Sequence, residues 1–259
     1  MMEHDSQEKA YAVDQRGIAT LQITCGGPLN IISSVSARLL TATLRDIAVD
    51  SRVRVVLLRG SGTKTFVGGA DIREMAALSP EAARAFITDL HALCEAVRDM
   101  PVPTVAVVRG WCIGVGLELA SACDLRIASD DAHFTMPEVR IGIPSVIQGA
   151  FLTRLVGEGR ARWLMLTGES IDSITAERWG LLNEVAGAEA LDSAVDRLAR
   201  LMAAHGAAGM RAQKRVLRTG EAPHLDAAMR HSIEIFSAPF ETTEPADAMQ
   251  AFLSKRRHG

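Results

Sequence analysis

The stretch that decides the fold lies between residues 101 and 129 and reads PVPTVAVVRGWCIGVGLELASACDLRIAS. Its β-branched beginning predicts a strand over 104–109, followed by a glycine-containing turn and an apolar helix that begins near Gly114. A new short strand is predicted over 124–128. The order strand, turn, helix, strand favours an α/β fold in which most strands pair in parallel.

The flanking sequence repeats this order. Residues 18–23 and 53–59 have the β-branched content of strands, and residues 35–49 between them carry leucines at helical spacing. A further helical stretch is interrupted near Pro80 and ends near Asp99. The last third is mostly helical, with helical periodicity over 151–167, 173–179, 191–218, 225–236 and 245–255. No low-complexity linker separates these parts, so one folding unit is expected.

Composition excludes several classes of protein. The chain has 259 residues, of which 48% are hydrophobic and 23% charged, with 28 basic and 31 acidic side chains. Disorder is excluded, and the basic footprint of a nucleic-acid-binding protein is missing. The apolar stretches are well short of the roughly 20 residues that span a bilayer, so no membrane partner is expected. The polar segment 1–10 lacks the features of a signal or transit peptide, which favours a cytoplasmic location.

The cysteines and histidines do not have metal-site spacing. Cys25, Cys94, Cys112 and Cys123 form no CxxC pair and lie mostly in apolar surroundings, so they are interpreted as small core residues in a reducing compartment. The seven histidines form no HxxxH pair. No metal site is therefore expected.

Two glutamates stand in apolar surroundings. Glu118 interrupts the run IGVGLELASAC, where a buried carboxylate needs a partner or a purpose. One alternative is an ion pair with Arg109 or Arg126. Glu138 follows Pro137 in FTMPEVRIGIP, and its alternative is an ordinary surface loop. Two such carboxyl groups suit acid/base chemistry. A glycosidase is disfavoured because aromatic residues, which usually bind sugars, make up only 4% of the chain.

Two glycine-bearing turns precede helices, VGGAD at 67–71 and GVG at 114–116. Each offers free backbone N–H groups at a helix N-terminus, and two such donors form an oxyanion hole. The alternative for the first turn is a tight turn with Asp71 as the helix cap, which is compatible with a functional role. Nucleotide signatures fail, since GSGTKT lacks the Gly-Lys of a P-loop and Leu119 replaces the third glycine of the dinucleotide motif. No GxSxG motif is present.

An ordered set of motifs resembles the crotonase superfamily, most closely its enoyl-CoA hydratase/isomerase branch. These motifs are PLN at 28–30, TFVGGADIREM at 65–75, the stretch at 101–129 quoted above, MPEVRIGIP at 136–144 and WGLLNEV at 179–185. The resemblance implies an α/β crotonase-like spiral of repeated strand-strand-helix units over 1–195. It also implies a helical C-terminal region over 196–259, part of the same folding unit, that mediates trimerisation. A homotrimer, or a hexamer built as a dimer of trimers, is the implied assembly.

The family's functional positions fall on defined residues of this chain. The resemblance implies that the N–H groups of Ala70 and Val115 form the oxyanion hole and that Glu118 and Glu138 are the catalytic carboxyl groups. The presence of both glutamates favours an enoyl-CoA hydratase, which adds water across a 2-enoyl-CoA thioester in the syn sense. The alternatives are an isomerase that converts 3-enoyl-CoA to 2-enoyl-CoA and a non-catalytic acyl-CoA-binding protein.

The resemblance also implies a binding site for coenzyme A, which enters as part of the thioester substrate. No other cofactor and no metal are implied. The positions that match the family's CoA-binding segments are Gly68, Gly69, Ala70, Asp71, Ile72, Arg73, Phe252 and Lys255. Phe252 and Lys255 match C-terminal residues that reach the CoA of a neighbouring subunit.

The chain departs from the family pattern at three places. Val115 stands where the family usually has glycine, which keeps the N–H but adds a β-branched side chain near the acyl channel. The family's glycine-rich stretch after the second glutamate is here the bulkier PSVIQG at 144–149. The basic residue that often precedes the Leu-Asn pair at 29–30 is absent.

Overall fold

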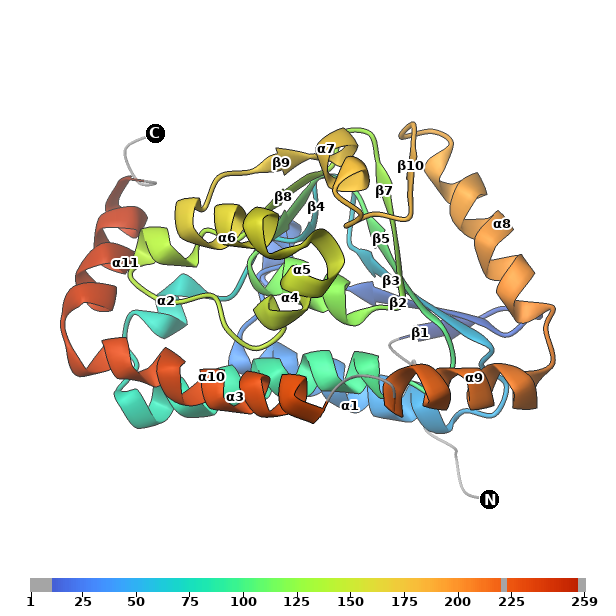
Figure 1. Ribbon diagram of the computed structural model, residues 1–259, viewed down its shortest axis with the longest axis horizontal. Coiled ribbons are helices and arrows are strands. Elements are labelled where there is room, and N and C mark those ends of the chain that lie inside the picture. Colours follow the sequence, from blue (N-terminus) through green and yellow to red (C-terminus); the bar gives the residue numbers. More distant parts are fainter. Residues whose placement is uncertain (1–10, 220–222, 256–259) are drawn as a thin grey trace, which may run out of the picture.

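The computed structural model describes residues 11–219 and 223–255, so the N-terminal segment 1–10 lies outside the described residues. Its strands form two sheets (Figure 1). The larger sheet contains, in spatial order, β1 (Tyr11–Val13), β2 (Ile18–Ile23), β3 (Val55–Gly60), β5 (Thr104–Val108), β7 (Leu125–Ser129) and β10 (Glu184–Ala186). The smaller sheet contains β4 (Thr65–Val67), β6 (Trp111–Ile113), β8 (His133–Thr135) and β9 (Ile171–Asp172).

Helices connect and cover these sheets. In the first two thirds of the chain they are α1 (Ser34–Val49), α2 (Ile72–Met75), α3 (Pro80–Arg98), α4 (Val115–Ala122), α5 (Gly149–Val156), α6 (Glu158–Thr167) and α7 (Ser173–Arg178). The C-terminal helices are α8 (Leu191–Ala203), α9 (Ala207–Thr219), α10 (Pro223–Ser237) and α11 (Glu244–Lys255). Short 3-10 helices are η1 (Gly27–Leu29), η2 (Glu138–Ile141) and η3 (Ala238–Glu241). Within the described ranges, no helix has the length and apolarity needed to cross a bilayer.

The strands and helices repeat as a spiral. Each turn gives one strand to the larger sheet and the next strand to the smaller sheet, and then continues into a helical segment: β3, β4 and α2–α3, then β5, β6 and α4, then β7, β8 and η2. Within both sheets these strands pair in parallel, whereas β1 with β2 and β8 with β9 pair antiparallel. The predicted α/β class with mostly parallel pairing and repeated strand-strand-helix units is confirmed.

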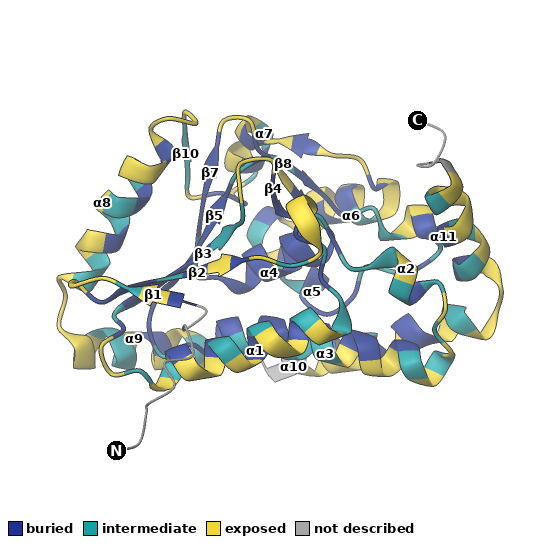
Figure 2. Cartoon of the chain, turned by 180° about the vertical axis from the view of Figure 1, so that it is seen from behind, coloured by how far each residue is buried: buried dark blue, intermediate teal, exposed yellow. Residues whose placement is uncertain are grey.

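The central strands are buried on both faces, as parallel strands usually are. Side chains alternate along a strand, so Val56 and Leu58 of β3 enter the main core while Val55 and Leu57 enter a second core on the opposite face. On the first face, α1 and α3 pack side by side and turn their exposed residues outward (Figure 2). On the second face, α8 supplies the cover.

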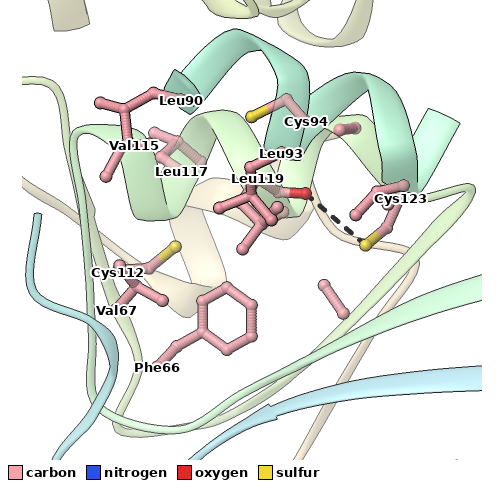
Figure 3. Packing of buried hydrophobic residues seen from close by; sticks show 14 of the residues in the cluster. Phe66, Val67, Leu90, Leu93, Cys94, Cys112, Val115, Leu117, Leu119 and Cys123 are labelled. Atoms are coloured by element: carbon pink, nitrogen blue, oxygen red, sulfur yellow. Dashed lines mark hydrogen bonds between the residues drawn. The ribbon is translucent and has the colours of Figure 1, made fainter. Parts of the chain in front are cut away.

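Helix α4 lies in the middle of the main core, and all its residues are buried. Leu117 and Leu119 pack among side chains of α3 and above Phe66 of β4 (Figure 3). Cys94, Cys112 and Cys123 are buried in this region, and the Cys123 thiol lies 3.6 Å from the Leu119 carbonyl oxygen. The interpretation of these three cysteines as core residues is confirmed. Cys25 is half-buried and packs against the main core.

The C-terminal helices are tied to the rest of the chain. The Lys214 ammonium of α9 is nearly buried and lies 2.6 Å from a carboxylate oxygen of Asp124, and Arg218 pairs with Glu95 and Asp99 of the α3 end. Helix α10 runs along α3 (Figure 1). The boundary expected at 195/196 falls inside α8, whose apolar face packs on the larger sheet on both sides of that boundary.

Candidate active site

A pocket opens between the N-terminal end of α4, the segment after β4, helix α3, η2 and helix α10. It is lined by Gly68, Gly69, Ala70, Ile72, Met75, Phe86, Ile87, Leu90, Ile113, Gly114, Val115, Glu118, Pro137, Glu138, Ile141, Ile143, Pro144, Val146 and Phe236. The two predicted glutamates and the two predicted glycine turns therefore meet in one cavity. Its remaining walls are almost wholly apolar, which keeps the dielectric constant around the carboxyl groups low.

Glu118 lies in the first turn of α4 and is only 4% exposed. The backbone N–H of Gly149 donates to its Oε1 at 3.1 Å. Burial and the nearby carboxyl of Glu138 raise the pKa of Glu118 well above its ordinary value, and the Gly149 hydrogen bond opposes this rise. Its surroundings therefore oppose ionisation of Glu118 more strongly than water does.

The alternative of an ion pair at Glu118 is wrong. The Arg126 guanidinium donates to the carbonyl oxygens of Leu181 and Cys123, and Arg109 pairs with Asp192. Within 11–219 and 223–255, no basic side chain forms an ion pair with Glu118, and none contributes to the shift of its pKa. Because no ion pair accounts for this buried carboxyl, a role in ligand binding or in a reaction is favoured.

Glu138 is the first residue of η2 and is half-buried. The Ser145 hydroxyl donates to its Oε2 at 2.8 Å. Burial raises the pKa of Glu138, and the Ser145 hydrogen bond opposes this rise. Its Oε1 approaches the backbone at Gly114, where a side chain would collide with the carboxylate. The surface-loop alternative is wrong, because this carboxyl lines the pocket beside Glu118.

Ala70 and Val115, whose backbone N–H groups are the predicted oxyanion donors, both line the pocket. Ala70 forms a parallel bridge with Ile32, in which the Ile32 N–H donates to Gly69 and the Asp71 N–H donates to Ile32. Such a bridge leaves the N–H of Ala70 itself on the opposite side. Val115 is the first residue of α4, so its N–H has no acceptor within the helix. Both residues line the pocket, as an oxyanion hole requires.

A close contact between α4 and β4 brings the two turns together. A Cβ at Gly116 would lie 2.5 Å from the Val67 carbonyl oxygen, so only glycine allows the helix to approach the strand this closely. On the other side of the turn, Asp71 caps α2 by accepting from the N–H groups of Arg73 and Glu74. The cap interpretation of Asp71 is confirmed, while residues 68–70 line the pocket beside it.

Arg73 and Phe252, which are also predicted to bind CoA, are not among the residues that line the pocket. Arg73 is exposed on α2, and Phe252 is 38% exposed on α11. Helix α11 packs against α2 and η2 of the same chain. Lys255 is the last residue of α11, and its side chain lies outside the described part of the structure.

Sequence reasoning missed the apolar walls and the polar supports of the pocket. Phe86, Ile87 and Leu90 belong to the buried face of α3, which the helical period alone marks as core, with no sign that it also lines a cavity. Phe236 comes from α10, far along the chain. The partner Ser145 lies in the loop after η2 and the partner Gly149 is the first residue of α5, and no periodicity in the sequence marks either of them as a partner of a glutamate.

Comparisons with known proteins identify the family of this chain. The family model described as enoyl-CoA hydratase/isomerase matches residues 14–258. A short-chain-enoyl-CoA hydratase from Clostridium acetobutylicum is 33% identical over 93% of this chain and 92% of its own length. A crotonyl-CoA hydratase from Syntrophomonas wolfei is 37% identical over 80% of each chain.

Solved structures share the fold. An enoyl-CoA hydratase from Bacillus halodurans superimposes with a TM-score of 0.86 at 22% identity, covering 93% of this chain and 98% of the other. An enoyl-CoA hydratase/isomerase from Xanthobacter autotrophicus Py2 gives a TM-score of 0.83 at 26% identity, covering 95% and 97%. By sequence and by fold, the chain belongs to the enoyl-CoA hydratase/isomerase family, the crotonase family.

Proposed function

We propose that this protein is an enoyl-CoA hydratase, which converts a 2-enoyl-CoA thioester and water to a 3-hydroxyacyl-CoA. The observation that carries the proposal is the presence of two carboxyl groups, Glu118 and Glu138, in one apolar pocket with the backbone donors of Ala70 and Val115. Hydration needs one group to take a proton from water and another to give a proton to carbon. The names of the relatives at 33% and 37% identity support the same reaction.

In the proposed mechanism the N–H groups of Ala70 and Val115 donate to the thioester carbonyl oxygen. They polarise the double bond and stabilise the enolate-like charge that forms when water attacks the β-carbon, an effect of about 10²–10³ for each oxyanion donor. Glu118 takes the proton from the attacking water, and Glu138 delivers a proton to the α-carbon. The water oxygen and the new hydrogen add to the same face, and the charges balance.

The two carboxyl groups titrate as a pair, so the active form is the pair that holds one proton. Burial raises the pKa of both groups, which favours the form of the pair that holds a proton. After each turnover, Glu118 holds the proton from water and Glu138 has given one away. Return of one proton from Glu118 to Glu138 restores the starting state.

Binding of the CoA part is proposed to use the backbone of residues 68–70 and the exposed cation of Arg73, which lies on the helix directly after that segment. Phe252 and Lys255 are proposed to act between subunits of a homotrimer or hexamer. Size-exclusion chromatography with light scattering measures that assembly directly.

The test is the loss of the ultraviolet absorbance of the conjugated thioester when the purified protein is mixed with crotonyl-CoA and with a longer 2-enoyl-CoA. We expect the absorbance to fall, and the Glu118→Gln and Glu138→Gln variants to slow this loss by about 10²–10⁴ because each removes one proton-transfer group. Both variants are nearly isosteric and should still bind the thioester, as calorimetry would show.

Two outcomes would contradict the proposal. Full activity of either glutamine variant would exclude the mechanism with two glutamates. Thioester binding by the folded wild-type protein without any loss of absorbance would exclude hydration. In that case, conversion of a 3-enoyl-CoA to the conjugated 2-enoyl-CoA would indicate the isomerase, and no turnover would indicate a binding protein.

A further inference from the structure

The bulky segment PSVIQG at 144–149 lies between Glu138 and α5 and ends at a residue that touches Glu118. This contact is the hydrogen bond from the Gly149 N–H to Glu118 Oε1, at 3.1 Å. A carboxylate oriented by one donor depends on the position of that donor. The contacts that fix the backbone of residues 147 and 148 therefore determine the orientation of the Glu118 carboxyl in the pocket.

Ile147 has an unusual backbone conformation. Its φ is 41°, in the left-handed region that β-branched residues rarely adopt, and its side chain is fully buried. Such a conformation persists only where the surroundings hold it in place. Here the Ile147 N–H donates to the Ser232 hydroxyl of α10 at 2.8 Å, and that hydroxyl donates in turn to the Met229 carbonyl oxygen at 2.7 Å.

Gln148 is fixed by a second contact. It is fully buried, and its Nε2 donates to Glu95 Oε1 of α3 at 2.9 Å. Glu95 is itself fixed by ion pairs with Arg98 of the same helix and with Arg218 of α9, the latter at 3.0 Å. The N-terminal end of α5 is thus connected to α3, α9 and α10 by directed hydrogen bonds.

We propose that Gln148 and Ser232 are positioning residues that hold the Gly149 N–H against Glu118 and so orient this carboxyl for proton transfer. The inference rests on the proposed hydratase function and deepens it. It assigns a purpose to the departure from a glycine-rich stretch, because a bulky loop that is anchored at both 147 and 148 fixes the Gly149 N–H more rigidly than free glycines would. It also gives the C-terminal helix α10 a role in the reaction through Ser232.

The first test removes the Ser232 hydroxyl. In Ser232→Ala the Ile147 N–H loses its acceptor, and we expect kcat for 2-enoyl-CoA hydration to fall by about tenfold, the effect of one hydrogen bond, while KM changes by less than about twofold. Ser232→Thr keeps the hydroxyl and should restore kcat. The matched control is Ser237→Ala, because Ser237 lies on the same helix and its hydroxyl donates only to the Glu234 carbonyl oxygen.

The second test acts at Gln148. Gln148→Met keeps the length of the buried side chain but cannot donate to Glu95, so kcat should fall in the same way with KM little changed. Thermal unfolding of each variant checks that the protein is folded under the assay conditions. An unchanged kcat in both Ser232→Ala and Gln148→Met, with an active wild-type protein, would overturn the inference.

A third measurement does not need turnover. Hydrogen exchange is allowed to proceed in the folded protein and is then measured by mass spectrometry of peptides that contain residues 147–149. These amides should exchange faster in Ser232→Ala and Gln148→Met than in wild type, Ser232→Thr and Ser237→Ala. Equal exchange in all five proteins would overturn the inference. This measurement does not depend on turnover. If the wild-type protein does not hydrate enoyl-CoA, the proposed function is wrong, but the exchange rates still show whether Gln148 and Ser232 hold residues 147–149 in place.

Discussion

The carboxyl of Glu118 affects stability as well as chemistry. Burial and the neighbouring Glu138 raise its pKa well above the ordinary value of 4.5, so the folded protein binds this proton more tightly than the unfolded chain does. The stability that this difference provides is fully present below pH 4.5 and is lost as the pH rises through the pKa of the folded state. At neutral pH the buried Glu118 carboxyl therefore lowers the free energy of unfolding.

Glu118→Gln should consequently raise the free energy of unfolding at neutral pH. The glutamine amide oxygen still accepts from the Gly149 N–H, and the cost of ionising a buried carboxyl disappears. The gain over wild type should shrink as the pH falls toward 4.5. Urea unfolding of both proteins from about pH 4 to about pH 8 measures this difference. A difference that does not change with pH would show that Glu118 ionises as easily in the folded as in the unfolded state.

Asn30 explains the PLN motif in physical terms. It is fully buried at φ 50°, its Nδ2 donates to the carbonyl oxygens of Thr65 and Phe66 at 3.0 and 3.1 Å, and its Oδ1 accepts from the Ser61 hydroxyl. Asparagine tolerates the left-handed region better than most residues. This side chain thus fixes β4, the strand that leads directly into residues 68–70 of the pocket.

Asn30→Ala should destabilise the protein by about 2–4 kcal/mol. The change leaves buried carbonyl oxygens without donors and places alanine in a left-handed conformation. Chemical denaturation measures the loss. Asn30→Asp is the informative companion, since it keeps the shape but cannot donate. A loss below about 1 kcal/mol for both variants would mean that water satisfies these carbonyl groups.

Single residues also show how far prediction from sequence reaches. Glu118 and Glu138 stood out as carboxyl groups among apolar residues, but their assignment to one site came from the family resemblance. Gln148 and Ser232 were not predictable, since their contacts join positions 53 and 85 residues apart and neither residue type is unusual in its own surroundings. The local sequence gives the type of each residue, but the residues that it contacts depend on how the whole chain packs.

Among the elements, the long strands and helices were predictable and the short ones were not. The strand predicted over 18–23 is observed as Ile18–Ile23, and that predicted over 53–59 is observed as Val55–Gly60. The strands β4, β6 and β8 have only three residues each, too few to show a period of two. The helical region 151–167 contains two helices, because Gly157 lies between them at φ 83°.

Helix α10 closes the apolar part of the pocket through Phe236, which is 2% exposed and faces the lining residues of α3. Phe236→Ala should enlarge this space and shift the ratio of kcat/KM toward longer 2-enoyl-CoA substrates by about tenfold or more, the effect expected for extra methylene groups in an apolar pocket. The change should also cost about 3–5 kcal/mol of stability, as for other buried Phe→Ala changes.

Phe240→Ala is the matched control for this prediction. Phe240 contacts Phe236 with ring centroids 5.5 Å apart, but it is not among the residues that line the pocket. It should lower stability without changing the preference for chain length. Parallel assays with crotonyl-CoA and a longer 2-enoyl-CoA distinguish the two variants. Equal selectivity of Phe236→Ala and wild type would show that the acyl chain lies elsewhere.

At the scale of the whole molecule, the two hydrophobic cores join the parts of the chain that a division at 195/196 would separate. The outer face of the larger sheet, with Val105, Val107 and Ile127, is covered by Val195 and Ala199 of α8. Five of the six strands of this sheet lie before residue 130 and the sixth is β10, whereas the helix that covers the sheet crosses the boundary at 195/196. Folding of the spiral should therefore require residues beyond 195.

Two substitutions within α8 test this dependence in the full-length protein. Ala199 is fully buried against the sheet, so Ala199→Asp places a charge in the second core and should destabilise the whole molecule by several kcal/mol in one cooperative transition. Leu201 is 56% exposed on the same helix, and Leu201→Asp should change stability by less than about 0.5 kcal/mol. Far-ultraviolet circular dichroism and tryptophan fluorescence should report the same midpoint. If Ala199→Asp instead gave two transitions, with loss of helix before any change in the fluorescence of the tryptophans, which all precede residue 196, then residues 196–259 would be a separate stability unit and the division at 195/196 would be a true boundary.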